Sequence, residues 1–148
     1  MTDPLVKKLQ TVDAFVVVDL PGADSADGLV RCAPKVLVDS TRALARSRTY
    51  AWALMGHRIS GASAGINASA DTRAAAIEGF CAEVAPEVAA GRLVLSAGKG
   101  VEHDELATLD TVPAPDAEAF VKGLLACVAA ARSHSRGFGR TGLHDCGR

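Results

Sequence analysis

The chain has 148 residues, of which 49% are hydrophobic and 22% are charged, and its formal net charge is −1. This length and composition indicate one folded globular domain and exclude a chain that is disordered throughout. No basic stripe is visible, and the longest apolar run, near Ala14–Val18, is far too short to cross a bilayer. We therefore expect no nucleic-acid partner and no membrane partner.

The cysteines do not follow a metal-binding or redox spacing. No C-x-x-C pair is present, and His134, His144 and Cys146 fit no zinc pattern, so we expect no metal site. The N-terminal segment lacks the apolar core of a signal peptide. We expect a cytoplasmic protein whose cysteines are buried, reduced thiols, except for an exposed Cys146; the four are Cys32, Cys81, Cys127 and Cys146.

The first third of the chain contains two predicted strands. Residues 1–12 form a short amphipathic lead-in without a clear element of their own. The β-branched run Ala14–Asp19 predicts a buried strand that ends in a Leu-Pro-Gly turn, and Leu29–Cys32 predicts a second, short strand.

A helix and a run of small residues follow. Asp39 and Ser40 are candidate N-caps for a helix through about Arg48, and residues 50–58 either prolong it or turn inward. The run Ser60–Ile66 contains only glycine, alanine and serine before its isoleucine. Such a run lets the backbone approach a ligand or lets two elements pack tightly, and the sequence leaves both interpretations open.

The second predicted helix has an apolar stripe. Asp71 or Thr72 caps it, Pro86 should kink or divide it, and Gly91 marks its end. The stripe consists of Ile77, Phe80, Cys81, Val84 and Val88.

Three shorter predicted elements come next. Arg92–Ser96 predicts a third strand, Gly98–Gly100 a tight turn at its carboxyl end, and residues 102–109 a short acidic helix. Strands that alternate with helices indicate an α/β domain.

A strong amphipathic helix is predicted from residue 113 to about Arg132. Its first turn is acidic and its last is basic, as the helix dipole favours. Its expected buried face consists of Ala117, Phe120, Val121, Leu124, Leu125 and Val128. We therefore expect a domain over residues 1–132 and a disordered tail over residues 133–148.

Three segments together resemble the glutamate/leucine/phenylalanine/valine dehydrogenase family. They are Gly28–Pro34 (GLVRCAP), Leu44–Tyr50 (LARSRTY) and Ser60–Ile66 (SGASAGI). In that family a GGxR segment leads through a helix to MTxK and then to GGGKxxI. The likeness continues to about residue 132. It implies the family's N-terminal substrate-binding and dimerisation domain, an α/β fold with a small mixed sheet flanked by helices.

The residues that act in the family are absent from this chain. Its lysines fall on Asp27, Ala51 and Ser63, and its catalytic aspartate falls on Gly98, or on Lys99 if the turn shifts by one. In the family the lysines hold the substrate carboxylate and polarise the reacting carbon, while the aspartate moves protons. Because that chemistry needs fixed cations and a tuned base, the resemblance implies a domain without dehydrogenase activity.

The family's cofactor domain also has no counterpart. A dinucleotide site needs a strand, a G-x-G-x-x-G turn and a helix, and Gly137-Phe138-Gly139 has neither element beside it. We therefore expect no cofactor.

Five residues are candidates for lining a remodelled pocket: Asp27, Gly28, Ser63, Gly98 and Lys99. Asp27 and Lys99 form either a charge-swapped pair, opposite in sign to the family's lysine and aspartate, or two unrelated surface charges.

Other polar side chains near the expected pocket have two interpretations. His57 and Arg58 reach the pocket mouth or lie on an exposed loop. Ser63 is a nucleophile only if a base such as His103 lies beside it, and is otherwise structural.

Two functions remain after these observations. The first is a non-catalytic assembly or partner subunit, which forms a homodimer or larger homo-oligomer or pairs with a dehydrogenase-like protein. The second is a repurposed enzyme or binding protein that takes an amino-acid-like small molecule in the remodelled pocket.

Overall fold

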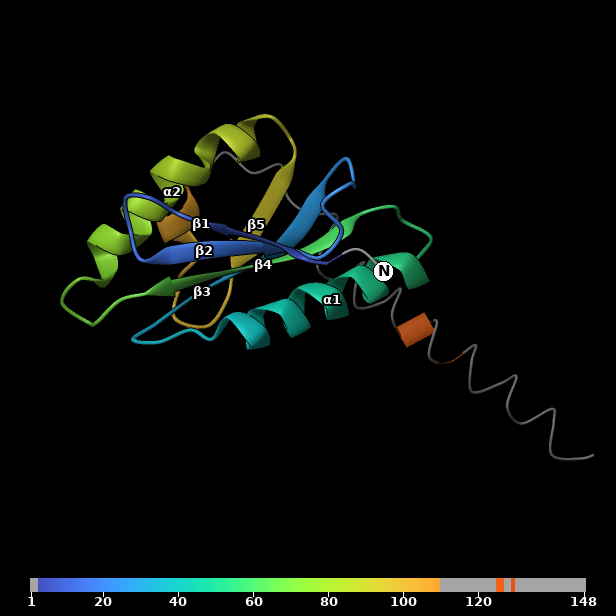
Figure 1. Ribbon diagram of the computed structural model, residues 1–148, viewed down its shortest axis with the longest axis horizontal. Helices are drawn as coiled ribbons and strands as arrows, with labels where there is room; N and C mark the ends of the chain where they lie inside the picture. The colour runs from blue at the N-terminus through green and yellow to red at the C-terminus, as the bar shows by residue number, and fades with distance from the viewer. Residues whose placement is uncertain (1–2, 110–124, 127–128, 130–148) are drawn as a thin grey trace, which may run out of the picture. The chain divides into compact units, whose positions relative to one another are not determined.

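The computed structural model describes residues 3–109, 125–126 and 129. Its first unit, Met1–Ala114, contains a five-stranded mixed sheet and two long helices, which confirms the predicted α/β class (Figure 1). The strand order is β1-β2-β4-β3-β5, in which β3, β4 and β5 run parallel and β1 and β2 are antiparallel to their neighbours. The strands are β1 (Leu5–Lys8), β2 (Ala14–Val18), β3 (Ala26–Ala33), β4 (Ser60–Asn67) and β5 (Leu93–Ala97).

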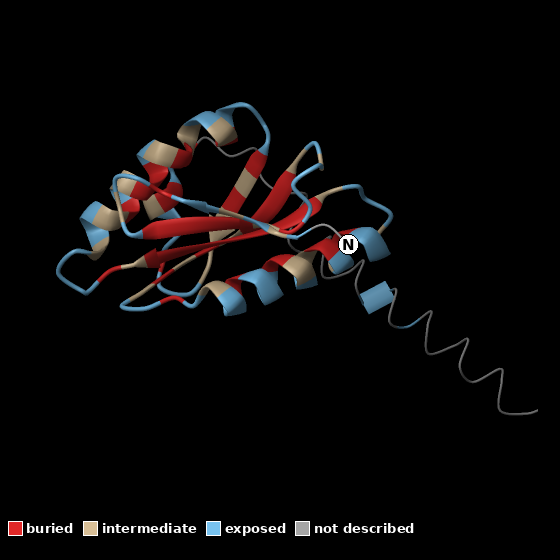
Figure 2. Ribbon diagram, viewed as in Figure 1, coloured by how far each residue is buried: buried red, intermediate tan, exposed pale blue. Residues whose placement is uncertain are grey.

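The two helices, α1 (Val38–Leu54) and α2 (Arg73–Ala89), cover opposite faces of this sheet (Figure 1). Their inner sides are buried and their outer sides exposed (Figure 2). The face under α2 carries the main apolar cluster, which includes Val30, Ile66 and Phe80. The face under α1 has a smaller cluster around Phe15 and Val17, so more of it is left to polar side chains.

Three strands differ from the expectation. Strand β3 begins at Ala26 and ends at Ala33, whereas the sequence predicts a strand over Leu29–Cys32 alone, so Asp27 lies on it. Residues 5–8 of the predicted lead-in form edge strand β1, which pairs with β2 from Leu5↔Val18 to Lys8↔Phe15. The small-residue run is the central strand β4, buried from Ser60 to Ile66. Of the two interpretations of this run, the structure therefore supports tight packing between elements.

The first helix begins earlier and ends later than predicted. Its N-cap is Leu37, and neither Asp39 nor Ser40 caps it, because the Ser40 hydroxyl instead donates to the Leu37 carbonyl at 2.8 Å. The loop before it is held by the Asn67 side chain, which accepts from the Val36 N–H at 2.7 Å. Residues 50–54 prolong the helix.

The second helix has the predicted stripe of buried residues. Thr72 is its N-cap position, although its side chain makes no capping hydrogen bond, and Pro86 lies inside the helix without dividing it. Gly91 follows at a φ of 69°, a left-handed conformation that suits glycine at a helix end. Neither α1 nor α2 combines the length and apolar character that crossing a bilayer requires.

The chain after β5 makes the predicted turn. The Val101 N–H donates to the Gly98 carbonyl at 3.1 Å, and Gly100 has a φ of 80°. The predicted acidic helix is a single 3₁₀ turn, η1 (Asp104–Leu106), held to α2 by Arg73, which binds the Glu105 carboxylate.

Most of the predicted C-terminal helix and all of the expected tail lie outside the described residues. Residues 125, 126 and 129 are helical, but Leu125, expected on the buried face, is exposed. Cys32 and Cys81 are buried free thiols, as predicted, whereas Cys127 and Cys146 lie outside the described residues.

Candidate functional site

Polar side chains gather on the sheet face that α1 covers. Side chains alternate between the two faces along a strand. Val30 of β3 and Ile66 of β4 belong to the apolar cluster under α2, so the odd-numbered residues of both strands point toward α1. These include Asp27 and Arg31 of β3 and Ser63 of β4.

Asp27 is the centre of this group. It is 3% exposed and has two partners on α1: the Arg48 guanidinium, which forms an ion pair with carboxylate oxygen Oδ2, and the Trp52 indole N–H, which donates to the same oxygen at 2.8 Å. Arg48 and Trp52 are four residues apart, so they lie on the same side of the helix. The carboxylate is thus held by the chain's own side chains.

Gly61 allows α1 to come this close to the sheet. A Cβ at this position would lie 1.8 Å from the Ala45 carbonyl oxygen of α1, which no side chain can accommodate. The Gly61 N–H instead donates to the Thr49 hydroxyl at 2.8 Å. The small-residue strand therefore places α1 directly over Asp27 and Ser63.

Three buried polar atoms on this face have no hydrogen-bond partner among the described residues. They are Asp27 Oδ1, Ser63 Oγ and Arg31 Nε. Ser63 is paired in register with Leu29, which lies between Asp27 and Arg31 on β3, so the three side chains are neighbours on one surface. Unpaired buried polar atoms cost free energy. A water molecule or a small ligand that bonded to these three atoms would recover that free energy.

The other three candidate pocket residues do not join this cluster. Gly28 lies on the opposite face, where a Cβ would meet the Ala62 backbone at 2.2 Å. Gly98 lies beyond β5, and its N–H donates to the Val30 carbonyl at 2.8 Å. Lys99 is exposed, and its carbonyl accepts from the Cys32 N–H at 3.0 Å.

The structure excludes a charge-swapped pair between Asp27 and Lys99. Asp27 is at the beginning of β3, whereas Lys99 lies against Cys32 near the end of the same strand. Five residues of strand separate these points, which is roughly 16 Å. Nor are they two surface charges, because Asp27 is buried and bound to Arg48.

The remaining sequence candidates also have defined places. His57 and Arg58 are exposed, and the His57 ring packs edge-on against Trp52 with a centroid distance of 5.4 Å. Ser63 Oγ has no hydrogen-bonded base in the described part of the chain. The described residues also contain no cluster of His, Cys, Asp and Glu that could hold a metal ion.

Sequence reasoning missed Arg48 and Trp52 as the partners of Asp27. The sequence did contain one indication of this pairing. Arg48 and Trp52 are four residues apart, so on a helix packed next to position 27 both can face it. Without the helix register, nothing in the sequence distinguished Arg48 from its neighbours Arg42 and Arg46. Arg46 in fact binds a different buried carboxylate, that of Asp19, at 2.9 Å.

A dinucleotide does not fit the two turns that lead from a strand into a long helix. Residues 34–37 lead from β3 to α1, and residues 68–72 lead from β4 to α2. Neither turn contains a glycine, whereas a pyrophosphate needs a glycine-rich turn to approach the backbone.

Comparison with solved structures finds the same fold in amino-acid dehydrogenases. The hetero-hexameric glutamate dehydrogenase from Thermus thermophilus, in its leucine-bound form, is similar to 72% of this chain with a TM-score of 0.56 and 21% sequence identity. The L-tryptophan dehydrogenase from Nostoc punctiforme is similar to 77% of it with a TM-score of 0.58 and 19% identity. No family model matches the sequence, and no curated protein matches it significantly.

This likeness covers only part of each dehydrogenase. The chain spans 28% of the T. thermophilus protein and 35% of the N. punctiforme protein. At these identities the comparison shows the fold alone: the chain has the α/β architecture of one dehydrogenase domain.

Proposed function

We propose that this protein is a non-catalytic homologue of the dehydrogenase dimerisation domain that acts as an assembly or partner subunit. The observation that carries this proposal is the buried Asp27, which Arg48 and Trp52 hold from α1. The position that the resemblance gives to a substrate-binding lysine is thus occupied by a carboxylate already engaged within the chain.

The charge at this site supports the loss of dehydrogenase chemistry. Arg48 neutralises the Asp27 carboxylate, so this pair does not offer the cation with which the family's lysines attract the carboxylate of an amino acid. The other two lysine positions are Ala51 and Ser63, neither of which carries charge. Loss of one preorganised hydrogen-bond donor to the transition state lowers a rate by roughly 10²–10³-fold, and here all three lysine positions are replaced.

The assembly role is supported by the sheet and by the comparison. Among the described residues, β1 and β5 are edge strands without a further strand beside them, and such edges can pair with another chain. The T. thermophilus enzyme is described as hetero-hexameric, so this fold occurs in a dehydrogenase built from unlike subunits.

Light scattering of the purified chain tests the assembly role. For the chain alone we expect a mass that is a multiple, greater than one, of 15.2 kDa; with a co-expressed dehydrogenase-like partner we expect the summed mass of both proteins. A monomer under both conditions would refute the proposal. The same sample should give no NADH with leucine or glutamate and NAD, and measurable turnover by the purified protein would refute its non-catalytic part.

A second candidate function is the binding of an amino-acid-like small molecule. The observation that favours it is the group of unpartnered buried atoms on Asp27, Ser63 and Arg31. Asp27 Oδ1 could accept from an ammonium group and Arg31 Nε could donate to a carboxylate. Thermal-shift measurements with amino acids and keto acids test this function, and no shift with any of them would count against it.

A further inference from the structure

Strand β1 has an unpaired outer edge. The Leu9 N–H donates to the Ala14 carbonyl at 2.9 Å, which fixes the hydrogen-bonding phase between β1 and β2. Hydrogen-bonded and non-hydrogen-bonded residue pairs alternate along an antiparallel ladder. The backbone groups of Leu5 and Lys7 therefore face β2, and those of Val6 and Lys8 point away from it. No hydrogen bond to these outward groups occurs among the described residues.

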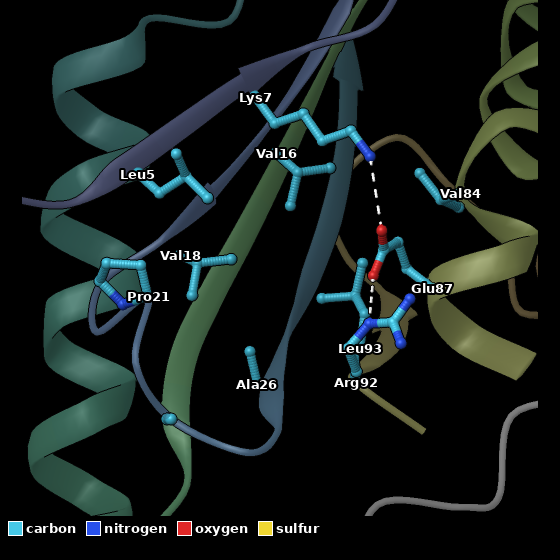
Figure 3. A pocket seen from close by; sticks show the side chains of 11 residues that line it. Leu5, Lys7, Val16, Val18, Pro21, Ala26, Val84, Glu87, Arg92 and Leu93 are labelled. Atoms are coloured by element: carbon cyan, nitrogen blue, oxygen red, sulfur yellow. Dashed lines mark hydrogen bonds and ion pairs between the residues drawn. The ribbon is translucent and has the colours of Figure 1, made fainter. Parts of the chain in front are cut away.

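An apolar hollow of about 180 Å³ opens beside this strand on the α2 face (Figure 3). Leu5 of β1 stands at its open side and is 51% exposed. The volume suits one or two side chains and is below the usual range for a whole small-molecule ligand. Its apolar lining includes Leu5, Val16, Val18, Ala26, Val84 and Leu93.

The rim of this hollow has an excess of positive charge. Glu87 binds Arg92 at 2.7 Å and Lys7 at 3.7 Å, so one carboxylate is shared by two cations (Figure 3). Arg92 makes the closer contact. The Lys7 ammonium, whose side chain is 53% exposed, can therefore accept a second carboxylate. Lys8 adds another exposed positive charge on the opposite face of the same strand.

We propose that the β1 edge and the hollow together bind an extended acidic segment of an unlike partner protein. The segment pairs with the outward backbone groups of Val6 and Lys8. It places an apolar side chain in the hollow next to Leu5, and its carboxylates lie across from Lys7 and Lys8. This inference rests on the proposed role as a partner subunit and specifies the surface and the chemistry of the partner.

A second copy of this chain is a poorer occupant of the edge. Two of the four residues of β1 are lysines, and lysines on an edge strand oppose pairing with an identical strand. The carboxylates of an acidic strand would instead attract the ammonium groups of both lysines. It also satisfies the backbone groups through main-chain pairing, which is how sheet edges bind peptides.

Fluorescence anisotropy with labelled peptides tests this inference on the full chain. The probe is an octapeptide of glutamates with one central leucine, so that carboxylates lie on both faces of the bound strand. The control peptides carry lysine in place of glutamate or are N-methylated at every residue. We expect the acidic peptide alone to bind, and to bind more weakly as the salt concentration rises. Equal binding of the basic or the N-methylated peptide would overturn the inference.

Three variants locate the peptide on the chain. Lys7→Glu should weaken binding by roughly tenfold, because it replaces an attraction with a repulsion. Val6→Pro should abolish binding without unfolding β1, since the Val6 N–H points outward and proline is tolerated there. Lys35→Glu, an exposed charge reversal outside the hollow, is the matched control and should leave the affinity unchanged. Unchanged affinity in both β1 variants would overturn the inference.

Light scattering of the same samples separates the two proposals. If the chain assembles but the acidic peptide does not bind, this surface inference fails and the partner-subunit role stands. If Val6→Pro converts an oligomer of the chain into a monomer, β1 binds a second copy and the inference is overturned. If the peptide binds but the chain assembles with nothing, the partner-subunit role fails instead.

Discussion

Trp52 and Arg48 bind the same oxygen of the Asp27 carboxylate, and both come from the helix that lies over it. The position to which the family resemblance assigns a substrate-binding lysine is here part of the packing between α1 and the sheet. Because the pair is largely desolvated, it stabilises only when both partners are present. The interaction therefore belongs to the stability of the domain.

Removing Arg48 should destabilise the protein measurably. Breaking a fully buried ion pair costs about 3–5 kcal/mol; the Arg48 side chain keeps 22% exposure, so we expect Arg48→Ala to lose about 2 kcal/mol in urea unfolding. Arg42→Ala is the control, because the ion pair that Arg42 forms among the described residues is with the exposed Asp39, and should lose less than about 0.5 kcal/mol. Equal losses would contradict the structural role of the pair.

A methyl group at Gly61 should be poorly tolerated. Gly61→Ala places a Cβ 1.8 Å from the Ala45 carbonyl oxygen, so α1 must move away from the sheet. We expect a loss of about 3 kcal/mol or more in the free energy of unfolding. Gly22→Ala, where no atom lies within 4 Å of the added Cβ, should stay within about 0.5 kcal/mol of the original chain. A thermal melt of each variant measures the difference.

The buried thiols should be unreactive in the folded protein. Burial raises the pKa of both Cys32 and Cys81, so the thiolate is scarce at mildly alkaline pH. In a Cys127→Ser, Cys146→Ser background, we expect almost no alkylation by iodoacetamide until denaturant is added. Rapid modification of the folded chain, measured by mass spectrometry, would contradict the packing around these cysteines.

Glu83 should contribute to stability at neutral pH but not in acid. Hydrogen bonds from the Thr11 backbone and hydroxyl, together with the Gln10 N–H, lower the pKa of its carboxyl. The carboxyl therefore has a lower pKa in the folded protein than in the unfolded chain, where it is about 4.3. Its hydrogen bonds stabilise the fold fully above that unfolded pKa, and the stabilisation is lost as the pH falls through the folded pKa.

Glu83→Gln tests this dependence. The variant should be less stable at pH 7 and should show a shallower loss of stability on acidification, followed by urea unfolding at a series of pH values. Glu78→Gln, an exposed position on the same helix, is the control. An acid profile for Glu83→Gln that matches the original chain would contradict the role of these hydrogen bonds.

The elements with strong local signals were predictable from the sequence. Ala14–Val18 is β-branched, α2 has its apolar stripe, and β5 follows a helix-ending glycine, so each could be recognised in isolation. Strand β4 could not be, because glycine, alanine and serine have low strand propensity and its burial depends on its neighbours. Strand β1 is four residues long and half polar, which leaves too little pattern to detect.

The candidate site was predictable only in part. The spacing of the family-like motifs identified positions 27 and 63 as candidate pocket residues. The structure places both on the sheet face under α1. The bond from Asp27 to Arg48 depends on the register of α1 against the sheet, which no local pattern determines. For the same reason, the distance between Asp27 and Lys99 could not be known before the strand pairing was.

Trp52 gives the most direct test of whether this site is closed by the chain's own side chains. The protein contains a single tryptophan, so its indole N–H gives one unambiguous signal in a proton–nitrogen correlation spectrum. We predict a signal that exchanges slowly with solvent, shifts in Asp27→Asn, and stays unchanged at fixed pH when glutamate, leucine or their keto acids are added in excess. A saturable shift with any of these ligands would show an open, ligand-binding site and contradict the closure of the site by Arg48 and Trp52.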